Sequence, residues 1–273
     1  MAGEFSFEIN SGNGVFLVIL RSLIAFMAAG VGGFIAMGKK QVSHKVLCGL
    51  VSFAAGALLA VTLLHIMPET LELLGFYPGL FSLVGGTLVF AGIGKYVYFL
   101  CPACSASEHE GGYLRLGILM MVAMGIHSTV DGLAISAGSV ASSHAGVISS
   151  VGILILFAVS YHKVPEGMAL VSVARLAGYS RIKSLVITLI IEMTTAVGAL
   201  AGLFLLRNVN TQWLGITLGL VAGSFLYTVG FALLKEMYAH EKGSILKYVA
   251  FGFASIVAVS AVLKYAGLAV HSH

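Results

Sequence analysis

Long apolar runs separated by short polar connections dominate the pattern along this chain of 273 residues. A helix that crosses a membrane needs about 20 consecutive, mostly apolar residues. The runs do not alternate between apolar and polar residues, as the strands of a membrane-spanning β-barrel would. The pattern therefore predicts an all-α polytopic membrane protein with a single transmembrane domain, residues 1–273. Its eight spanning helices are expected at residues 14–37, 46–67, 79–100, 114–138, 145–172, 184–206, 212–234 and 246–269.

Composition supports the lipid bilayer as the solvent of this chain. Hydrophobic residues make up 59% of the sequence and charged residues 10%, whereas a soluble domain carries about a quarter charged residues. The 34 glycines indicate close packing between helices. No basic patch interleaved with aromatic residues suggests a nucleic-acid partner. A multi-pass protein of the cell (inner or plasma) membrane is predicted.

Basic residues at the connections predict the orientation, because Lys and Arg are enriched on the cytoplasmic side. The second and fourth connections carry neither, and the sixth carries only Arg207. The basic residues in or near the odd-numbered connections are Lys39, Lys40, Lys45, Arg115, Arg175, Arg181, Lys183, Lys235, Lys242 and Lys247. Both termini are therefore predicted to be extracytoplasmic. The first ten residues lack the basic stretch and cleavage site of a signal peptide, so the first apolar run is expected to stay as a spanning helix.

A faint internal repeat relates the second and seventh apolar segments. Gly56 precedes Glu69 by the same spacing at which Gly223 precedes Glu236, and the two segments cross the membrane in opposite directions. An inverted repeat in a 3+2+3 arrangement, with three helices on each side of a central pair, would produce this relation. The motif is short and the chain is rich in Gly and Ala, so the support is weak.

The fourth and fifth segments carry ionisable residues at membrane depth, where such residues are rare and mark functional pathways. His127 and Asp131 are spaced i, i+4, and so are His162 and Glu166, so each pair lies on one face of its helix. At 1.5 Å per residue, His127 lies roughly 20 Å into its segment from the cytoplasm, and His162 roughly 25 Å into its segment from outside. Two imidazoles and two carboxylates at similar depth are ligands that zinc prefers. These four residues are the predicted metal ligands.

Lys163, next to His162, is the unusual member of this group. A buried ammonium needs a carboxylate partner, and Glu192 or Asp131 is the expected one. One interpretation is an ion pair that locks the fifth and sixth helices together. The other is a fixed positive charge at a place where a second metal would otherwise bind. The two are compatible, and we favour both.

Four further residues are candidates for the ion pathway. His65 and Glu69 lie near the outer end of the second segment, and Glu236 lies near the inner end of the seventh. A solvated helix end explains these three about as well as a pathway does. Met124 shares the face of His127, where its thioether would suit soft ions, although packing is the commoner role of Met.

The third connection contains Cys101, Cys104 and His109, and it is cytoplasmic by the charge argument. A reducing compartment keeps such a dithiol free, and Cys-x-x-Cys with a nearby His can bind zinc. One Cys-x-x-Cys is only half of a structural zinc site, so the loop stays a weak candidate. The sequence leaves a homodimer open.

At these residues the chain resembles the ZIP (Zrt-, Irt-like) family of divalent-metal transporters. The fourth helix of the family typically reads His-Asn-x-Pro-Glu-Gly, and here HSTVDG begins at His127. The fifth typically reads His-Glu-x-Pro-Glu-Gly, and here HKVPEG begins at His162. HIMPE, which begins at His65, is similar to the family's His-x-x-Pro-Glu in the second helix, and the seventh helix is similar too. The resemblance covers essentially all eight predicted helices.

This resemblance implies a 3+2+3 fold that moves zinc, iron, manganese, cadmium or related ions into the cytoplasm by sliding one helix bundle past another. Many members hold two metals, and the second site would use the positions of Ser128, Lys163 and Glu192. A protonated lysine cannot act as a ligand. We therefore predict one transported ion, with Zn²⁺ favoured, and with Lys163 neutralising Glu166 and Glu192.

Rival hypotheses are an intramembrane zinc hydrolase and a metal sensor or efflux carrier on the same fold. Zinc held by His and acid residues can activate water. The sequence contains no His-Glu-x-x-His run, which counts against a hydrolase, and we predict that the chain is not an enzyme. Binding needs ionised carboxylates and neutral imidazoles, so transport is expected to fall at low pH.

Overall fold

The structure is a computed structural model that describes residues 12–38, 44–96, 113–144, 150–206, 210–239 and 242–266. Within these ranges every regular element is a helix, as the apolar runs predict. The helices are α1 (Gly12–Gly38), α2 (His44–Val61), η1 (Thr62–Ile66), α3 (Met67–Leu74), α4 (Phe76–Tyr96), α6 (Tyr113–His144), α7 (Ser150–Leu176), α8 (Arg181–Leu206), α9 (Thr211–Ala239) and α10 (Lys242–Tyr265).

Seven helical stretches of the described chain are long and apolar enough to cross a membrane. They are α1, the continuous run of α2, η1 and α3, and then α4, α7, α8, α9 and α10. α6 occupies the fourth predicted segment and has 32 residues, but it is not among the seven. The side chains of residues 113–120 lie outside the described part of the chain, and the seven stretches are drawn from the described residues alone. The chain is thus a polytopic helical membrane protein, and the count of eight spans stays a prediction.

The second predicted segment is longer than expected and contains an irregular turn. α2 passes into the π-helical turn η1 and then into α3, which ends at Leu74 rather than near residue 67. Pro68 stands in the first turn of α3. Proline has no N–H to donate and its ring crowds the preceding turn, and a wider π turn relieves that crowding. His65 lies in this turn.

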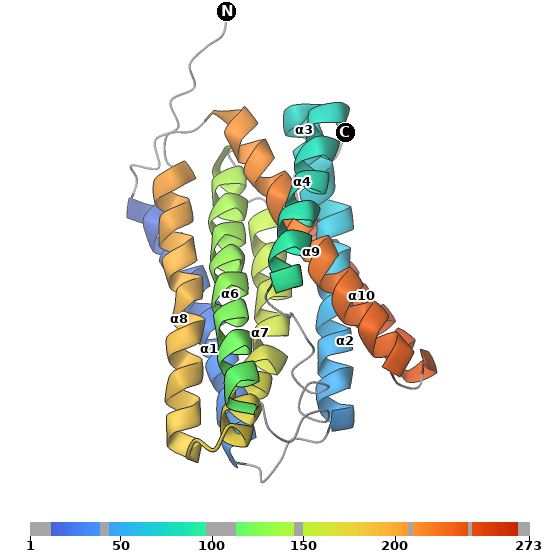
Figure 1. Cartoon of the computed structure of the whole chain (residues 1–273). Coiled ribbons are helices and arrows are strands. Elements are labelled where there is room, and N and C mark those ends of the chain that lie inside the picture. Colours follow the sequence, from blue (N-terminus) through green and yellow to red (C-terminus); the bar gives the residue numbers. More distant parts are fainter. Residues whose placement is uncertain are drawn as a thin grey trace, which may run out of the picture.

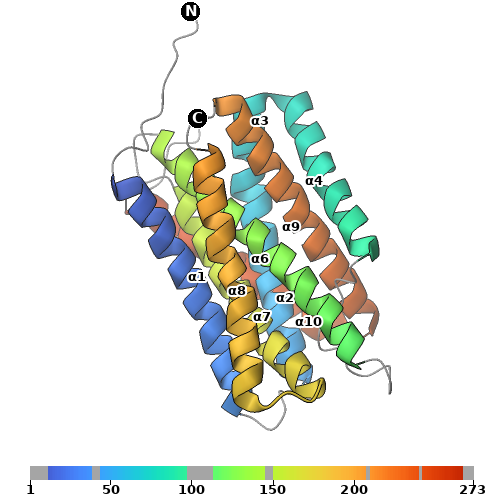
Figure 2. The ribbon, with the colours of Figure 1, turned by 60° about the vertical axis from the view of Figure 1, so that its left-hand side comes forward.

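The helices form two groups (Figure 1). α1, α6, α7 and α8 pack mainly on one another, and we call them the site bundle. α2 with η1 and α3, α4, α9 and α10 form the second bundle, and the two bundles meet chiefly where α2 packs on α7 and α6 packs on α9. Figure 2 shows α1 beside α8 at one edge of the molecule and α4 beside α9 at the other.

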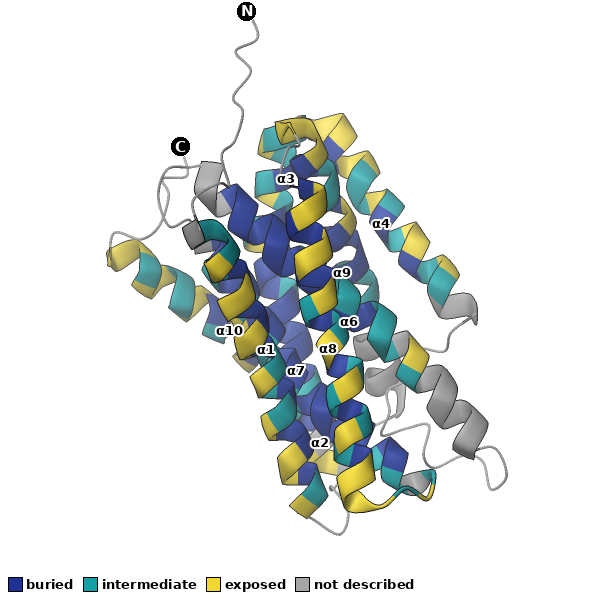
Figure 3. Cartoon of the chain, turned by 90° about the vertical axis from the view of Figure 1, so that its left-hand side faces the viewer, coloured by how far each residue is buried: buried dark blue, intermediate teal, exposed yellow. Residues whose placement is uncertain are grey.

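Burial follows this arrangement (Figure 3). Apolar side chains lie exposed along the outer helices, as expected where lipid is the neighbour, and the buried residues concentrate in the helices between them. In the apolar stretch of α7, 67% of the residues are buried inside the protein, against 17% in that of α4. α7 is therefore the central helix, and the predicted ligands His162 and Glu166 lie on it.

Candidate metal centre

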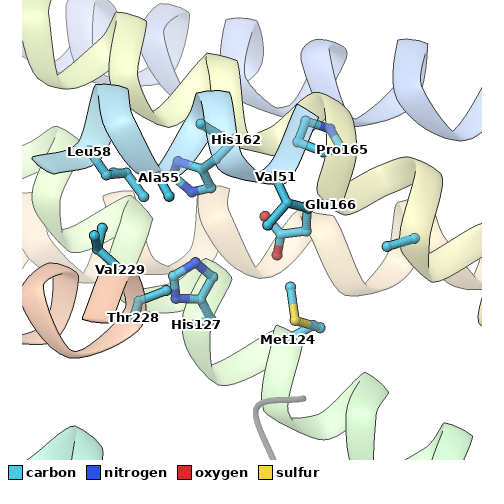
Figure 4. Close-up of a pocket in the computed structure, with 12 residues that line it drawn as sticks. Val51, Ala55, Leu58, Met124, His127, His162, Pro165, Glu166, Thr228 and Val229 are labelled. Carbon is cyan, nitrogen blue, oxygen red and sulfur yellow. The ribbon is translucent and has the colours of Figure 1, made fainter. Parts of the chain in front are cut away.

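α6 and α7 bring the four predicted ligands together. His127 and Asp131 project from α6, and His162 and Glu166 project from α7, because an i, i+4 spacing puts both members of a pair on one helix face. One ligand atom from each residue lies within 4.8 Å of the other three, and all four residues are buried. Figure 4 shows the two imidazoles facing each other across a small space that the Glu166 carboxylate also enters.

The hydrogen bonds of His162 fit a cation site. Nδ1 lies 3.0 Å from the carbonyl oxygen of Ala158, one turn earlier in α7, and Nε2 lies 3.0 Å from Oδ2 of Asp131. When Nδ1 donates to the carbonyl, Nε2 presents a lone pair, which orients it as a metal ligand. The repulsion between this lone pair and the carboxylate oxygen is relieved by a cation bound beside both atoms or by a second proton on the ring. The same Asp131 oxygen is 3.7 Å from Nε2 of His127, so both imidazoles converge on it.

Lys163 is fully buried and its ammonium is surrounded by oxygen atoms. Nζ donates a hydrogen bond to Oγ of Ser128 at 2.7 Å, and Ser128 donates in turn to Oε1 of Glu166 at 3.1 Å. Nζ also forms ion pairs with Glu166 at 2.8 Å and with Asp131 and Glu192 at 3.0 Å. The sequence predicts Glu192 or Asp131 as the partner, and the structure pairs Lys163 with both and with Glu166. Three helices are tied together at this ammonium.

The formal charge of this cluster matches one divalent cation. Asp131, Glu166 and Glu192 each contribute −1 when ionised, and Lys163 contributes +1, which leaves −2 with neutral histidines. Oδ1 of Asp131 and Oε1 of Glu192 are buried and have no hydrogen-bond partner among the described residues. A buried carboxylate oxygen without a partner is costly, so a bound cation would improve the balance.

Glycines let the neighbouring helices approach the ligand-bearing helices closely. Gly132 follows Asp131, and a Cβ there would overlap the carbonyl oxygen of Thr195 in α8. Gly167 follows Glu166, and a Cβ there would overlap the carbonyl oxygen of Ala29 in α1. α8 and α1 thus back the two carboxylates directly. The close packing between helices that the 34 glycines indicate is present at these two positions.

A cavity of ≈110 Å³ adjoins the cluster between the two bundles (Figure 4). Its walls include His127, His162 and Glu166 from the site bundle, and Val51 of α2 and Val229 of α9 from the second bundle. Apart from the ligand residues the lining is nearly all apolar. The cavity therefore brings an apolar space up to the cluster without further charged groups.

The remaining predicted residues fall into two groups. Met124 lines the cavity, as a pathway residue should, whereas His65 and Glu69 lie in η1 and α3 of the second bundle and not among its lining. Glu236 lies in α9, but its side chain is outside the described part of the chain. Cys101, Cys104 and His109 also lie outside the described residues.

Arg21 is absent from the residues predicted from the sequence. It lies within the first membrane-length stretch, is 3% exposed, and donates a hydrogen bond from Nη1 to Oγ of Ser139 in α6 at 2.7 Å. A basic residue inside an apolar run of spanning length is the signal that identifies such a residue.

Fold and site together define a polytopic helical membrane protein with a buried cluster of His, Asp and Glu that fits a metal site. The family model for the ZIP zinc transporter matches residues 102–260. The chain is 31% identical to the zinc transporter ZupT of Chlorobaculum parvum over 229 residues, which is 76% of this chain and 82% of that protein. It is equally similar to ZupT of Chlorobium chlorochromatii, and 30% identical to that of Chlorobium luteolum over 77% of this chain and 83% of the relative.

The chain belongs to the ZIP zinc transporter family. This confirms the resemblance seen at the motifs that begin at His127 and His162. Members of this family are multi-pass membrane transporters and not enzymes, which confirms that part of the prediction and agrees with a cell-membrane location.

Proposed function

We propose that this protein transports Zn²⁺ across the cell membrane through a site formed by His127, Asp131, His162 and Glu166. The observation that carries the proposal is the buried convergence of these four side chains from α6 and α7. Two imidazoles and two carboxylates form a four-donor set suited to zinc. The three relatives are each named as zinc transporters. Iron, manganese or cadmium would use the same donors, so zinc is first among the substrates rather than the only one.

We further propose that one ion is carried at a time. The ammonium of Lys163 lies among four oxygen atoms, from Ser128, Asp131, Glu166 and Glu192, at 2.7–3.0 Å. It thus occupies the position that a second cation would need. One zinc ion also neutralises the formal charge of −2, and a second would leave a buried excess of positive charge, which is costly.

Movement of the site bundle against the second bundle accounts best for transport. Close helix contacts at glycine lie within each bundle: Gly132 and Gly167 in the site bundle, Gly56 and Gly223 in the second. The cavity beside the site lies between the bundles. Among the described glycines, those that face the backbone of a neighbouring helix do so within a bundle, and none does so across the face that the two bundles share. An elevator-type movement needs this combination.

Import is the favoured direction. The cavity lining includes Met124, which precedes His127, and Ala169, which follows Glu166. Both lie toward the side where α6 begins and α7 ends, which the basic connections predict to be cytoplasmic. A path from the site to that side suits release into the cytoplasm. Efflux would require the opposite direction of flux under opposed zinc gradients, and this measurement separates the two.

A 3+2+3 inverted repeat within one transmembrane domain accounts for the packing of the helices. α2 packs on α10, and α9 packs on α4 through glycines at matching places, Gly56 and Gly223. α1 packs on α7 and α8 packs on α6 in the same manner. A repeat that relates α1, α2 and α4 to α8, α9 and α10, with α6 and α7 as the central pair, produces these equivalent contacts.

Zinc uptake into proteoliposomes tests the proposal. We expect His162→Ala and Glu166→Ala each to lower uptake by at least about 100-fold, because losing a ligand costs more than the roughly 10–100-fold cost of losing an outer partner. Lys183→Gln, at an exposed position near the start of α8, is the matched control and should transport like the wild type. Equal uptake by all four proteins would contradict the assignment of the site.

A further inference from the structure

A second buried cation lies in the site bundle, away from Lys163. Arg21 of α1 is 3% exposed and lies inside a membrane-length apolar stretch. Within the described residues, its side-chain partner is Oγ of Ser139, a neutral group that itself donates to the carbonyl oxygen of Ile135. No carboxylate of the described chain forms an ion pair with Arg21. A buried charge without an opposite partner is costly, and within a membrane such a residue indicates function.

The position of Arg21 relative to the metal centre is set by α6. Ser139, its partner, follows Asp131 by eight residues on the same helix. At 1.5 Å per residue this corresponds to about 12 Å along the helix axis. Met124 and the cavity lie beyond His127 in the other direction. The centre is therefore between an apolar cavity on one side and a buried guanidinium on the other.

The charges around the centre already balance without Arg21. The three carboxylates and Lys163 give a formal −2, which one divalent cation neutralises. Arg21 then adds a positive charge that no described group offsets. Because α1 and α6 belong to the same bundle, this charge keeps its distance from the centre when the bundle moves.

We propose that Arg21 is a fixed positive charge that repels a divalent cation at the centre, weakens its binding and so speeds its release. The inference rests on the proposed transport site. A centre with three carboxylates and two imidazoles would hold zinc tightly, and tight binding slows a carrier, because the ion must leave in each cycle. A positive charge within the same bundle lowers the affinity in every position of that bundle without blocking the path through the cavity.

Coulomb's law gives the size of the effect. At about 12 Å, the repulsion between one positive charge and a divalent cation lowers the affinity roughly threefold when the effective dielectric constant is about 80. The affinity falls roughly 100-fold when the effective dielectric constant is about 20. We expect a value between these limits, about tenfold. Because Arg21 is buried, added salt should screen the effect far less than it screens an exposed charge.

Zinc affinity of the full-length protein in detergent, measured by competition with a chromophoric chelator, tests this proposal. Arg21→Gln removes the charge and keeps a hydrogen-bond donor, and we expect its Kd for zinc to fall about tenfold with a slower dissociation rate. Arg21→Met should act in the same direction. Arg21→Lys keeps the charge, and Ser139→Ala keeps the charge but removes the hydrogen bond, so both should retain the wild-type Kd.

The direction in which the Kd for zinc changes separates this electrostatic role from a structural one. If Arg21 only clamped α1 to α6, then Arg21→Gln and Arg21→Met would leave zinc binding unchanged or weaker, and either result in these two variants would overturn the proposal. A Kd in Ser139→Ala that changes as much as in Arg21→Gln would overturn it as well, because the hydrogen bond rather than the charge would then be responsible. Lys183→Gln is the control for charge alone. Lys183 precedes Glu192 by nine residues on α8 and is exposed, so its neutralisation should not change the Kd.

His162→Ala in the same assay separates a failure of the proposed transport site from a failure of the role proposed for Arg21. Loss of high-affinity binding in His162→Ala together with a wild-type Kd in Arg21→Gln would refute the role of Arg21 and leave the transport site standing. Wild-type binding in His162→Ala would instead refute the site itself.

Discussion

The two bundles of this protein differ in what they bury. The described part of the site bundle buries Arg21, Lys163 and the carboxylates of the centre, together with both histidines. The buried polar residues of the second bundle, among those described, are Ser52, Thr62, Thr70 and Ser224, none of which carries a charge. Yet both bundles use the same device for close packing, a glycine that faces the backbone of a neighbouring helix.

The difference shows that backbone packing and charge have separate tasks in this fold. The described part of the second bundle packs closely at glycine without a buried charge, so this kind of packing does not depend on charge. In the site bundle the same packing stands beside the ion pairs of Lys163, which join three helices. We attribute the retention of the site bundle's charges, at a considerable desolvation cost, to the proposed binding and release of an ion. Changes at equivalent places in the two bundles should accordingly affect stability alike and zinc binding differently.

The largest expected effect comes from reversing the charge of Lys163. Lys163→Glu changes the formal charge of the cluster from −2 to −4, which suits two divalent cations. We expect elemental analysis to find two zinc ions per chain in this variant and one in the wild type. Lys163→Met removes the charge without adding a ligand and should bind at most one. A single ion in Lys163→Glu would contradict the role assigned to this lysine.

An intermediate effect is expected from adding one methyl group at a close helix contact in each bundle. Gly132→Ala would press on Thr195, and Gly223→Ala would press on Leu83. Overpacking costs about 1–3 kcal/mol, so both variants should unfold at lower temperature in detergent. Because Gly132 adjoins Asp131, only Gly132→Ala should also weaken zinc binding. Equal loss of zinc affinity in both would show that the second bundle shapes the site too.

The widest difference between the bundles is expected from removing one hydroxyl group in each, and the change at Ser224 is the smallest effect of all. Ser128→Ala removes a group that accepts from Lys163 and donates to Glu166, and hydrogen bonds to charged groups contribute about 1.5–3 kcal/mol. The Ser224 hydroxyl bonds only to the carbonyl oxygen of Val221 in its own helix. Ser224→Ala should therefore change stability by less than about 0.5 kcal/mol and leave the zinc Kd unchanged. Thermal unfolding with and without zinc measures both.

Sequence periodicity anticipated much of this molecule. The apolar runs located the helices, because the bilayer demands spans of known length. The i, i+4 spacing grouped His127 with Asp131 and His162 with Glu166, since that relation belongs to one helix. The π turn before Pro68 was not predicted, and the second span extends past its expected end as a result. The apolar run at residues 114–138 indicated the helix that the structure has as α6.

What the sequence by itself determined is therefore local: the helices, the faces on which the ligands lie, and the presence of ionisable residues at membrane depth. Only the tertiary structure decided how these faces meet. It joined Lys163 to carboxylates on α6, α7 and α8, directed both imidazoles at one Asp131 oxygen, and buried Arg21 against Ser139. The physical reason is that helix geometry relates residues within a few turns, whereas contacts between helices depend on packing of the whole bundle.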